Sequence, residues 1–304
     1  MKKNNKLIYF ITSIFMYGAG FSSIFRLCKS NSWIVILIGS IISIIFLPIY
    51  KKIINKNNKY IKLINILFIL LICMMILRIF ITSFYLTKTP GLFITIPFIL
   101  LCLRNKDINT LYKESNLLFL FSAIGITLNI IAATKTGSIK FLTPTLNISL
   151  LNIIKGIIYY VIFTLSPLIL IKDSEIDNKL FIFTNIFLVF MSVMIIFILG
   201  PNLISIYRFP EYMIYKEINL FGFVENVENL VCLVYFLNIF ITSSLCLINI
   251  KNVVKNNYTF YILVTLILFI TEFVSDKYKC SLFIYKYLPL ILLVFIFFNV
   301  LKKE

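Results

Sequence analysis

Long apolar runs alternate with short polar segments along the whole chain. Most runs have about 20 residues, the length that an α-helix needs to cross a bilayer. Read with a window of about 19 residues, the pattern predicts about ten membrane-spanning helices. Their expected ranges are near 7–26, 33–53, 62–86, 91–104, 116–134, 150–171, 180–199, 224–250, 258–274 and 282–301. The pattern therefore predicts an all-α polytopic membrane protein.

The predicted spans leave no room for a separate soluble domain. We treat residues 1–304 as one transmembrane domain, in which 1–135 and 150–304 would each hold five helices. The fourth run is short, and Pro90, Gly91 and Pro97 interrupt it. Whether this run crosses the whole membrane stays open.

Composition and charge agree with a membrane protein. The chain is 61% hydrophobic and 13% charged, whereas soluble domains average about 45–50% apolar and about 25% charged residues. The net charge is +17. Most Lys and Arg lie between the apolar runs, so they predict contact with the lipid bilayer and not with nucleic acid. With a cytoplasmic N-terminus, 17 of them fall in inner segments and 9 in outer loops. The positive-inside rule then places both termini in the cytoplasm.

Several kinds of chemistry find no support in the residues. The chain has no His, and its six Cys form no C-x-x-C pair. No phosphate-binding loop, clustered metal ligands or nucleophile–base pair is recognisable. We therefore expect no catalytic residue, no metal, no cofactor and no enzymatic activity.

Two spans carry features that interrupt a helix. Gly18, Ala19 and Gly20 lie inside the first, and Thr164, Ser166 and Pro167 lie inside the sixth. If the chain consists of two five-helix halves, these spans occupy corresponding positions. Paired interrupted helices point to a transporter's binding site at the membrane midplane. The alternative is close helix packing at the glycines and an ordinary proline kink, and both readings stay open.

Few ionisable residues lie inside the predicted spans. Arg78 and Glu228 fall at similar depths from the outer side, so we expect a charge pair between them. Glu225 shares a helix face with Glu228, and the face continues to Tyr235 and Asn238. Glu225, Glu272 and Lys286 are expected to reach for the lipid headgroups.

Four stretches, in order along the chain, resemble one family. They are YGAGFSSIFRLCKSNSWIVILIGSIIS, TKTPGLFITIPFILLCLR, LTPTLNISLLNIIKGIIYYVIF and RFPEYMIYKEINLFGFVENVENL. Together they are similar to the spore-germination permeases, the GerAB-like B subunits of nutrient germinant receptors. Two features of the sequence depart from that family. Asn226 stands where the family has an Arg, and the segment Phe163–Pro167 stands where the family has a glycine-rich break.

The resemblance implies the fold of the amino acid–polyamine–organocation (APC) superfamily. That LeuT-like fold has two inverted five-helix repeats, with helices one and six broken at the site. The implied partners are an A-type and a lipidated C-type receptor subunit in the spore inner membrane. The implied ligand is a small nutrient such as an amino acid. Its contacts would come from Gly18, Ala19, Gly20, Thr164, Ser166, Tyr235 and Asn238, while Arg78, Glu225 and Glu228 would act as gate or charge-pair residues.

Two other functions remain compatible with the sequence. The chain can be a secondary permease that moves amino acids with protons or sodium. It can also be a structural membrane subunit without a ligand. Neither the ligand, a coupling ion nor the subunit ratio follows from the residues.

Overall fold

A computed structural model describes residues 6–55, 59–84, 91–104, 107–133, 137–144, 148–172, 176–207, 209–216 and 228–275. Within these ranges the secondary structure is helical, and no strand occurs. Five helical stretches are long and apolar enough to cross a membrane: Phe21–Lys52, Lys59–Ile81, Leu150–Leu170, Asn178–Ile206 and Leu233–Val254. The structure is therefore consistent with an integral membrane protein. The predicted span at 282–301 lies outside the described residues.

The described residues of the first half form six α-helices and two short irregular helical segments. They are α1 (Leu7–Phe15), the π-helical η1 (Met16–Gly20), α2 (Phe21–Cys28), the 3-10 turn η2 (Lys29–Asn31), α3 (Ser32–Asn55), α4 (Lys59–Phe84), α5 (Leu92–Arg104) and α6 (Ile108–Ala133). The first predicted span is thus a helix that changes its geometry midway.

The described part of the second half contains five more α-helices. The elements are η4 (Ile139–Leu142), α7 (Leu150–Leu165), the 3-10 segment η5 (Ser166–Leu170), α8 (Asn178–Ile206), α9 (Pro210–Lys216), α10 (Glu228–Val254) and α11 (Asn257–Ser275). Helix α8 is longer than predicted because it continues past a kink at Gly200, whose φ is 73°. Glycine adopts such a φ without a steric penalty, and Pro201 follows it.

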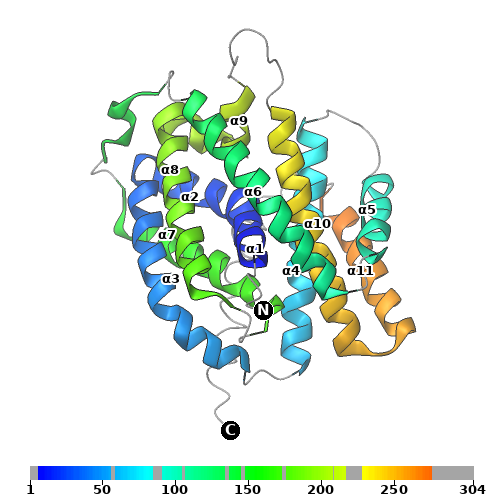
Figure 1. The fold of residues 1–304 in the computed structure, drawn as a ribbon. Coiled ribbons are helices and arrows are strands. Elements are labelled where there is room, and N and C mark those ends of the chain that lie inside the picture. The colour runs from blue at the N-terminus through cyan, green and yellow to red at the C-terminus, as the bar shows by residue number, and fades with distance from the viewer. Residues whose placement is uncertain are drawn as a thin grey trace.

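The helices form two groups, with α1 between them (Figure 1). In the first group α3 packs against α7 and α8, and α2 joins them. In the second group α4 packs against α10 and α11, and α5 also contacts α10 and α11. Each group pairs helices from the two halves of the chain: α3 with α8, α4 with α10, and α5 with α11.

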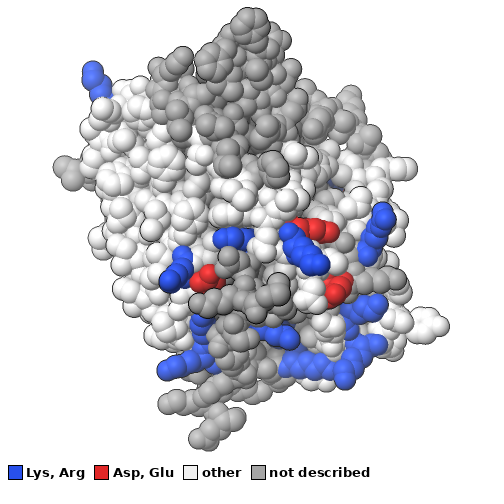
Figure 2. Space-filling model, viewed as in Figure 1, with Lys and Arg blue, Asp and Glu red and all other residues white. Residues whose placement is uncertain are grey.

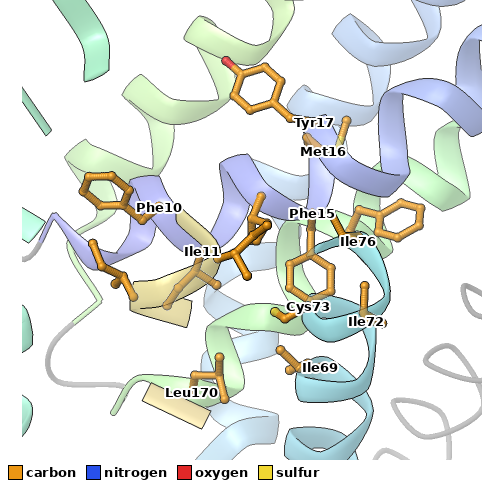
Figure 3. Close-up of a cluster of buried hydrophobic side chains, with 14 of the residues drawn as sticks. Phe10, Ile11, Phe15, Met16, Tyr17, Ile69, Ile72, Cys73, Ile76 and Leu170 are labelled. Carbon is orange, nitrogen blue, oxygen red and sulfur yellow. The ribbon is translucent and has the colours of Figure 1, made fainter. Parts of the chain in front are cut away.

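Helix α1 is buried along its whole length. All nine of its residues are inaccessible, and it contacts α6, α7, α8 and α10. Figure 3 shows Phe15 pointing toward Ile72 and Cys73 of α4. A helix that is apolar on every side can be enclosed in this way. Within a membrane, such contacts stabilise the protein through van der Waals packing.

Two glycines allow α3 and α7 to approach closely. A Cβ atom on Gly156 would lie 2.8 Å from a methyl carbon of Val35, and one on Gly39 would lie 2.9 Å from Cβ of Tyr160. Real side chains do not approach so closely, so any larger residue would separate the helices. The small side chains at Gly156 and Gly39 therefore permit the close packing of α3 and α7.

Basic residues gather at one end of the helices. Figure 2 shows Lys and Arg mainly over the lower part of the visible face, the end at which α3 meets α4 and α10 meets α11 in Figure 1. The described helix ends there carry Lys51, Lys52, Lys59, Lys251 and Lys255. This asymmetry agrees with the predicted grouping of basic loops.

Candidate functional site

The first helix changes geometry where the glycines predicted an irregularity. Met16–Gly20 form a π-helical turn that includes Gly18 and Ala19, for which only the backbone is described. The flanking residues Phe15 and Phe21 keep right-handed helical dihedral angles, so the chain is wound through this point. Such π-helical turns are frequent at functional sites because they alter the local hydrogen bonding.

The sixth predicted span also changes geometry, at Ser166. Helix α7 passes there into the 3-10 segment η5, with Pro167 in its first turn, and Ile171 is extended. The hydroxyl of Thr164 donates to the carbonyl of Tyr160 at 2.9 Å, within its own helix. Ser166 Oγ is buried and has no hydrogen-bond partner among the described residues. Of these two predicted contacts, Ser166 is therefore better placed to bind a ligand.

The two irregular segments lie in one buried region. η1 packs against α7, and α1 packs against η5. Side chains from both helix groups hold η5 by its carbonyl oxygens. The Tyr50 hydroxyl of α3 donates to Ser166 O at 3.3 Å, and Asn249 Nδ2 of α10 donates to Leu170 O at 2.9 Å. η5 is thus bonded to both groups.

Asn238 was predicted to contact a ligand near the first helix. It lies on α10 against α1. Ser13 Oγ donates to Asn238 Oδ1 at 3.3 Å, and both residues are buried. The neighbouring hydroxyl of Thr242 donates to the Asn238 carbonyl, so it is satisfied by its own helix. Asn238 therefore supplies a polar contact between the central helix and the second group.

Tyr235 lies in an aromatic cluster between η1 and α9. We define this outer aromatic cluster as Tyr17, Phe80, Phe209 and Tyr235. The Tyr235 ring stacks on Phe80 with centroids 4.9 Å apart, and its centroid lies 6.3 Å from Phe209 and 6.2 Å from Tyr17. Figure 3 shows Tyr17 pointing away from Phe15 and its apolar neighbours. Phe15 and Tyr17 therefore lie in different regions on either side of the chain.

Sequence analysis did not identify Glu211, which closes the outer aromatic cluster. It lies on α9, which packs against α6, α8 and α10, and only 2% of it is exposed. The Tyr235 hydroxyl is hydrogen-bonded to Glu211 Oε1, while Oε2 has no partner among the described residues. Burial raises the pKa of Glu211 to about 8. An acid after Pro210 is a detectable signal, but acids are also common in the first turn of an ordinary helix.

Arg78 forms an ion pair with Glu272 of α11. Its Nη1 lies 2.6 Å from Glu272 Oε2 and donates to the Glu272 carbonyl at 3.1 Å. The expectation that Glu272 reaches the headgroups is thus wrong, because its carboxylate faces a guanidinium. Glu225 and the side chain of Glu228 lie outside the described residues, as does Lys286. The predicted Arg78–Glu228 pair stays a prediction.

A polar group that sequence analysis missed joins α3, α7 and α8. Asn185 Oδ1 accepts hydrogen bonds from the Tyr160 hydroxyl at 2.8 Å and from Ser43 Oγ at 3.0 Å. All three residues are buried. Because these polar side chains are all hydrogen-bonded, they fix how α3, α7 and α8 pack together.

No protein-family model matches this chain, and no curated protein matches it. Among the described residues, no three His, Cys, Asp or Glu side chains come together as metal ligands.

Proposed function

We propose that this protein is the B subunit of a spore nutrient-germinant receptor. It binds a small, amino acid-like nutrient from outside and passes a conformational change to its partners, with ion or solute conduction as a possible accompaniment. The observation that carries the proposal is the pair of irregular segments, η1 and η5, in one buried region. Each belongs to a different half of the chain, as in transporters whose discontinuous helices form the substrate site.

The arrangement of the helices supports a LeuT-like fold of ten helices in two inverted repeats. Corresponding helices of the two halves are neighbours in each group: α3 with α8, and α4 with α10. A central helix between two groups suits a rocking motion of one group against the other. A ligand shifts the balance between two such states only by the difference in its affinity for them.

The proposed location is the spore inner membrane, with cytoplasmic termini and with A-type and lipidated C-type subunits as partners. The basic residues at the ends of α3 and α10 support this orientation, because cytoplasmic loops carry an excess of Lys and Arg. Adjacent genes for the two partner types would add support from the genome.

A second candidate is a permease that moves amino acids with protons or sodium. The same pair of irregular helices favours it, since secondary transporters use this geometry. Uptake of labelled amino acid by the chain without partners would favour the permease. Nutrient response that requires the A- and C-type subunits, without uptake, would favour the receptor.

The test is nutrient-triggered germination of spores that carry Gly20→Leu. A leucine side chain would fill the space beside η1, so we expect loss of the response with normal protein levels in the inner membrane. Gly20→Ala is the matched control. Its Cβ would meet Met16 Sδ at 2.8 Å, the far end of a flexible side chain, so the response should persist. An unchanged response in Gly20→Leu would remove the ligand site from η1.

A further inference from the structure

A buried acid and a cluster of aromatic rings meet beside η1. Glu211 places one carboxyl oxygen on the Tyr235 hydroxyl and leaves the other without a partner in the described part of the chain. The Tyr235 ring belongs to the outer aromatic cluster, which reaches Tyr17 in the π-helical turn. The Tyr235 side chain therefore connects Glu211 to η1, where we propose that the ligand binds.

This combination of groups has a specific chemistry. A buried carboxyl oxygen without a partner is costly, and a positive charge brought to it would remove that cost. The faces of aromatic rings also attract cations, most strongly where water is excluded. Phe80 and Tyr235 stack with 15° between their planes, and Phe209 meets Phe80 edge-on at 84°. Acid and rings together therefore favour an organic cation over a neutral or anionic group.

We propose that Glu211 and the outer aromatic cluster bind the ammonium group of a small organic ligand. This inference deepens the proposed function, and it relies on that function for a ligand that arrives from the α9 side. Since Glu211 is 2% exposed, the ligand reaches the carboxyl only when α9 moves away from α8 and α10. Binding at Glu211 therefore couples ligand arrival to the position of α9.

Among the described residues, few other ionisable groups surround Glu211. The adjoining parts of α8 (195–206) and α6 (121–133) contain no ionisable residue. Helix α10 contributes Tyr235, and it also carries Glu228 and Cys232, whose side chains are outside the described set. Tyr207 follows α8, and Tyr212, Tyr215 and Lys216 share α9 with Glu211. Glu211 is thus the acid that the described geometry presents to a ligand.

The proton on Glu211 makes the proposal measurable. Because burial raises the pKa of Glu211 to about 8, the carboxyl is mostly protonated at pH 7. An arriving ammonium group favours the carboxylate, so the proton is released to solvent as the ion pair forms. Apparent affinity depends on the fraction of protein already in the competent form. The apparent affinity for the ammonium ligand should therefore rise about tenfold per pH unit below pH 8 and level off above pH 8. It should fall again when the amine loses its own proton, at about pH 10.4.

The experiment is calorimetric titration of the full chain in lipid nanodiscs with n-butylammonium, with n-butanol as the uncharged analogue. Titrations at pH 7 in two buffers of different ionisation enthalpy count the released protons. We expect nearly one proton per bound butylammonium, and at least tenfold weaker binding of butanol. Glu211→Gln keeps a hydrogen-bond partner for Tyr235 but cannot ionise. It should lose at least tenfold in affinity for butylammonium and release no proton.

Two further variants separate this site from general effects. Glu114→Gln removes a carboxylate from the first two turns of α6 and should bind like the wild type. Tyr235→Phe keeps the ring while removing the hydroxyl that holds Glu211, and it should still prefer butylammonium to butanol. If Glu211→Gln unfolds, the wild-type proton count and the Tyr235→Phe preference still test the proposal.

Several results would overturn the proposal. They are no binding of butylammonium at pH 9, equal affinity for butanol, unchanged proton release in Glu211→Gln, or equally effective displacement by Na⁺. Failure of the receptor function looks different. Butylammonium would then bind with the expected proton release, while spores with Glu211→Gln would germinate normally.

Discussion

Arg78 of α4 and Glu272 of α11 form an ion pair with 2.6 Å between Nη1 and Oε2. The Arg78 side chain is 7% exposed and that of Glu272 is 22% exposed. One guanidinium therefore ties two helices of the second group together away from bulk water. Removing one partner of a buried pair leaves an uncompensated charge, which costs more than the intact pair contributes.

Arg78→Leu should destabilise the protein by about 3–5 kcal/mol, because it leaves the Glu272 carboxylate partly buried without its cation. Thermal unfolding in detergent measures the loss. The control is the double variant Arg78→Leu with Glu272→Leu, which removes both charges and should recover most of the stability. A double variant as unstable as Arg78→Leu would contradict the role of the ion pair.

Charge exchange distinguishes the partners of Arg78. Arg78→Glu combined with Glu272→Arg should restore the stability lost in Arg78→Glu, because the two groups are in contact. Arg78→Glu combined with Glu228→Arg is the comparison that the sequence prediction requires. Double-mutant analysis of unfolding gives each coupling. Restoration only in the Glu228 pair would mean that Glu272 is not the main partner.

Gly91→Ala, at the residue just before α5, should weaken the same ion pair. A Cβ atom on Gly91 would lie 2.5 Å from Arg78 Nε and 2.6 Å from Glu272 Oε2. Such overpacking costs about 1–3 kcal/mol and forces the charged side chains to shift. Thermal unfolding reports the cost. In an Arg78→Leu, Glu272→Leu background the same substitution should cost less, and an equal cost would place the strain elsewhere.

Asn185→Leu should destabilise the first helix group. It leaves the Tyr160 hydroxyl without its acceptor, at about 1–3 kcal/mol for a buried group left unsatisfied, whereas Ser43 Oγ can still donate to the Ser40 carbonyl. Adding Tyr160→Phe and Ser43→Ala to Asn185→Leu removes the stranded Tyr160 hydroxyl together with the second donor to Asn185, and should restore part of the stability. Unfolding of the single and triple variants is the measurement. A triple variant less stable than the single one would contradict this account.

Glu211 should make stability depend on pH. Its pKa rises from an ordinary 4.5 to about 8 on burial, so the folded protein holds a proton that the unfolded chain has lost between these values. Stability from this group is therefore greatest below pH 4.5 and falls by about 1.4 kcal/mol per pH unit up to about pH 8. Glu211→Gln should lack this slope. Unfolding of both proteins at pH 5, 6.5 and 8 gives the difference, and parallel curves would contradict it.

Local signals in the sequence identified the places where helices change geometry, because glycine and proline act on the backbone at their own positions. Gly18–Gly20 marked the π-helical turn, and Pro167 marked the 3-10 segment. Partners across the bundle were less accessible. Counting residues along its helix predicted the depth of Arg78 in the membrane. The count did not predict its partner, because it does not say which helix lies beside α4. Glu211 and Asn185 were missed because only folding brings Tyr235 and Tyr160 to them.

The central position of α1 has a consequence for how this protein is made. Residues Leu7–Phe15 are synthesised before α8 and α10, yet they pack against these helices, which follow more than a hundred residues later. Serines and threonines such as Ser13 reach partners like Asn238 only after α10 has been inserted. The nascent first helix must therefore wait beside the insertion machinery or in lipid, and completion of the bundle is a late event of translation.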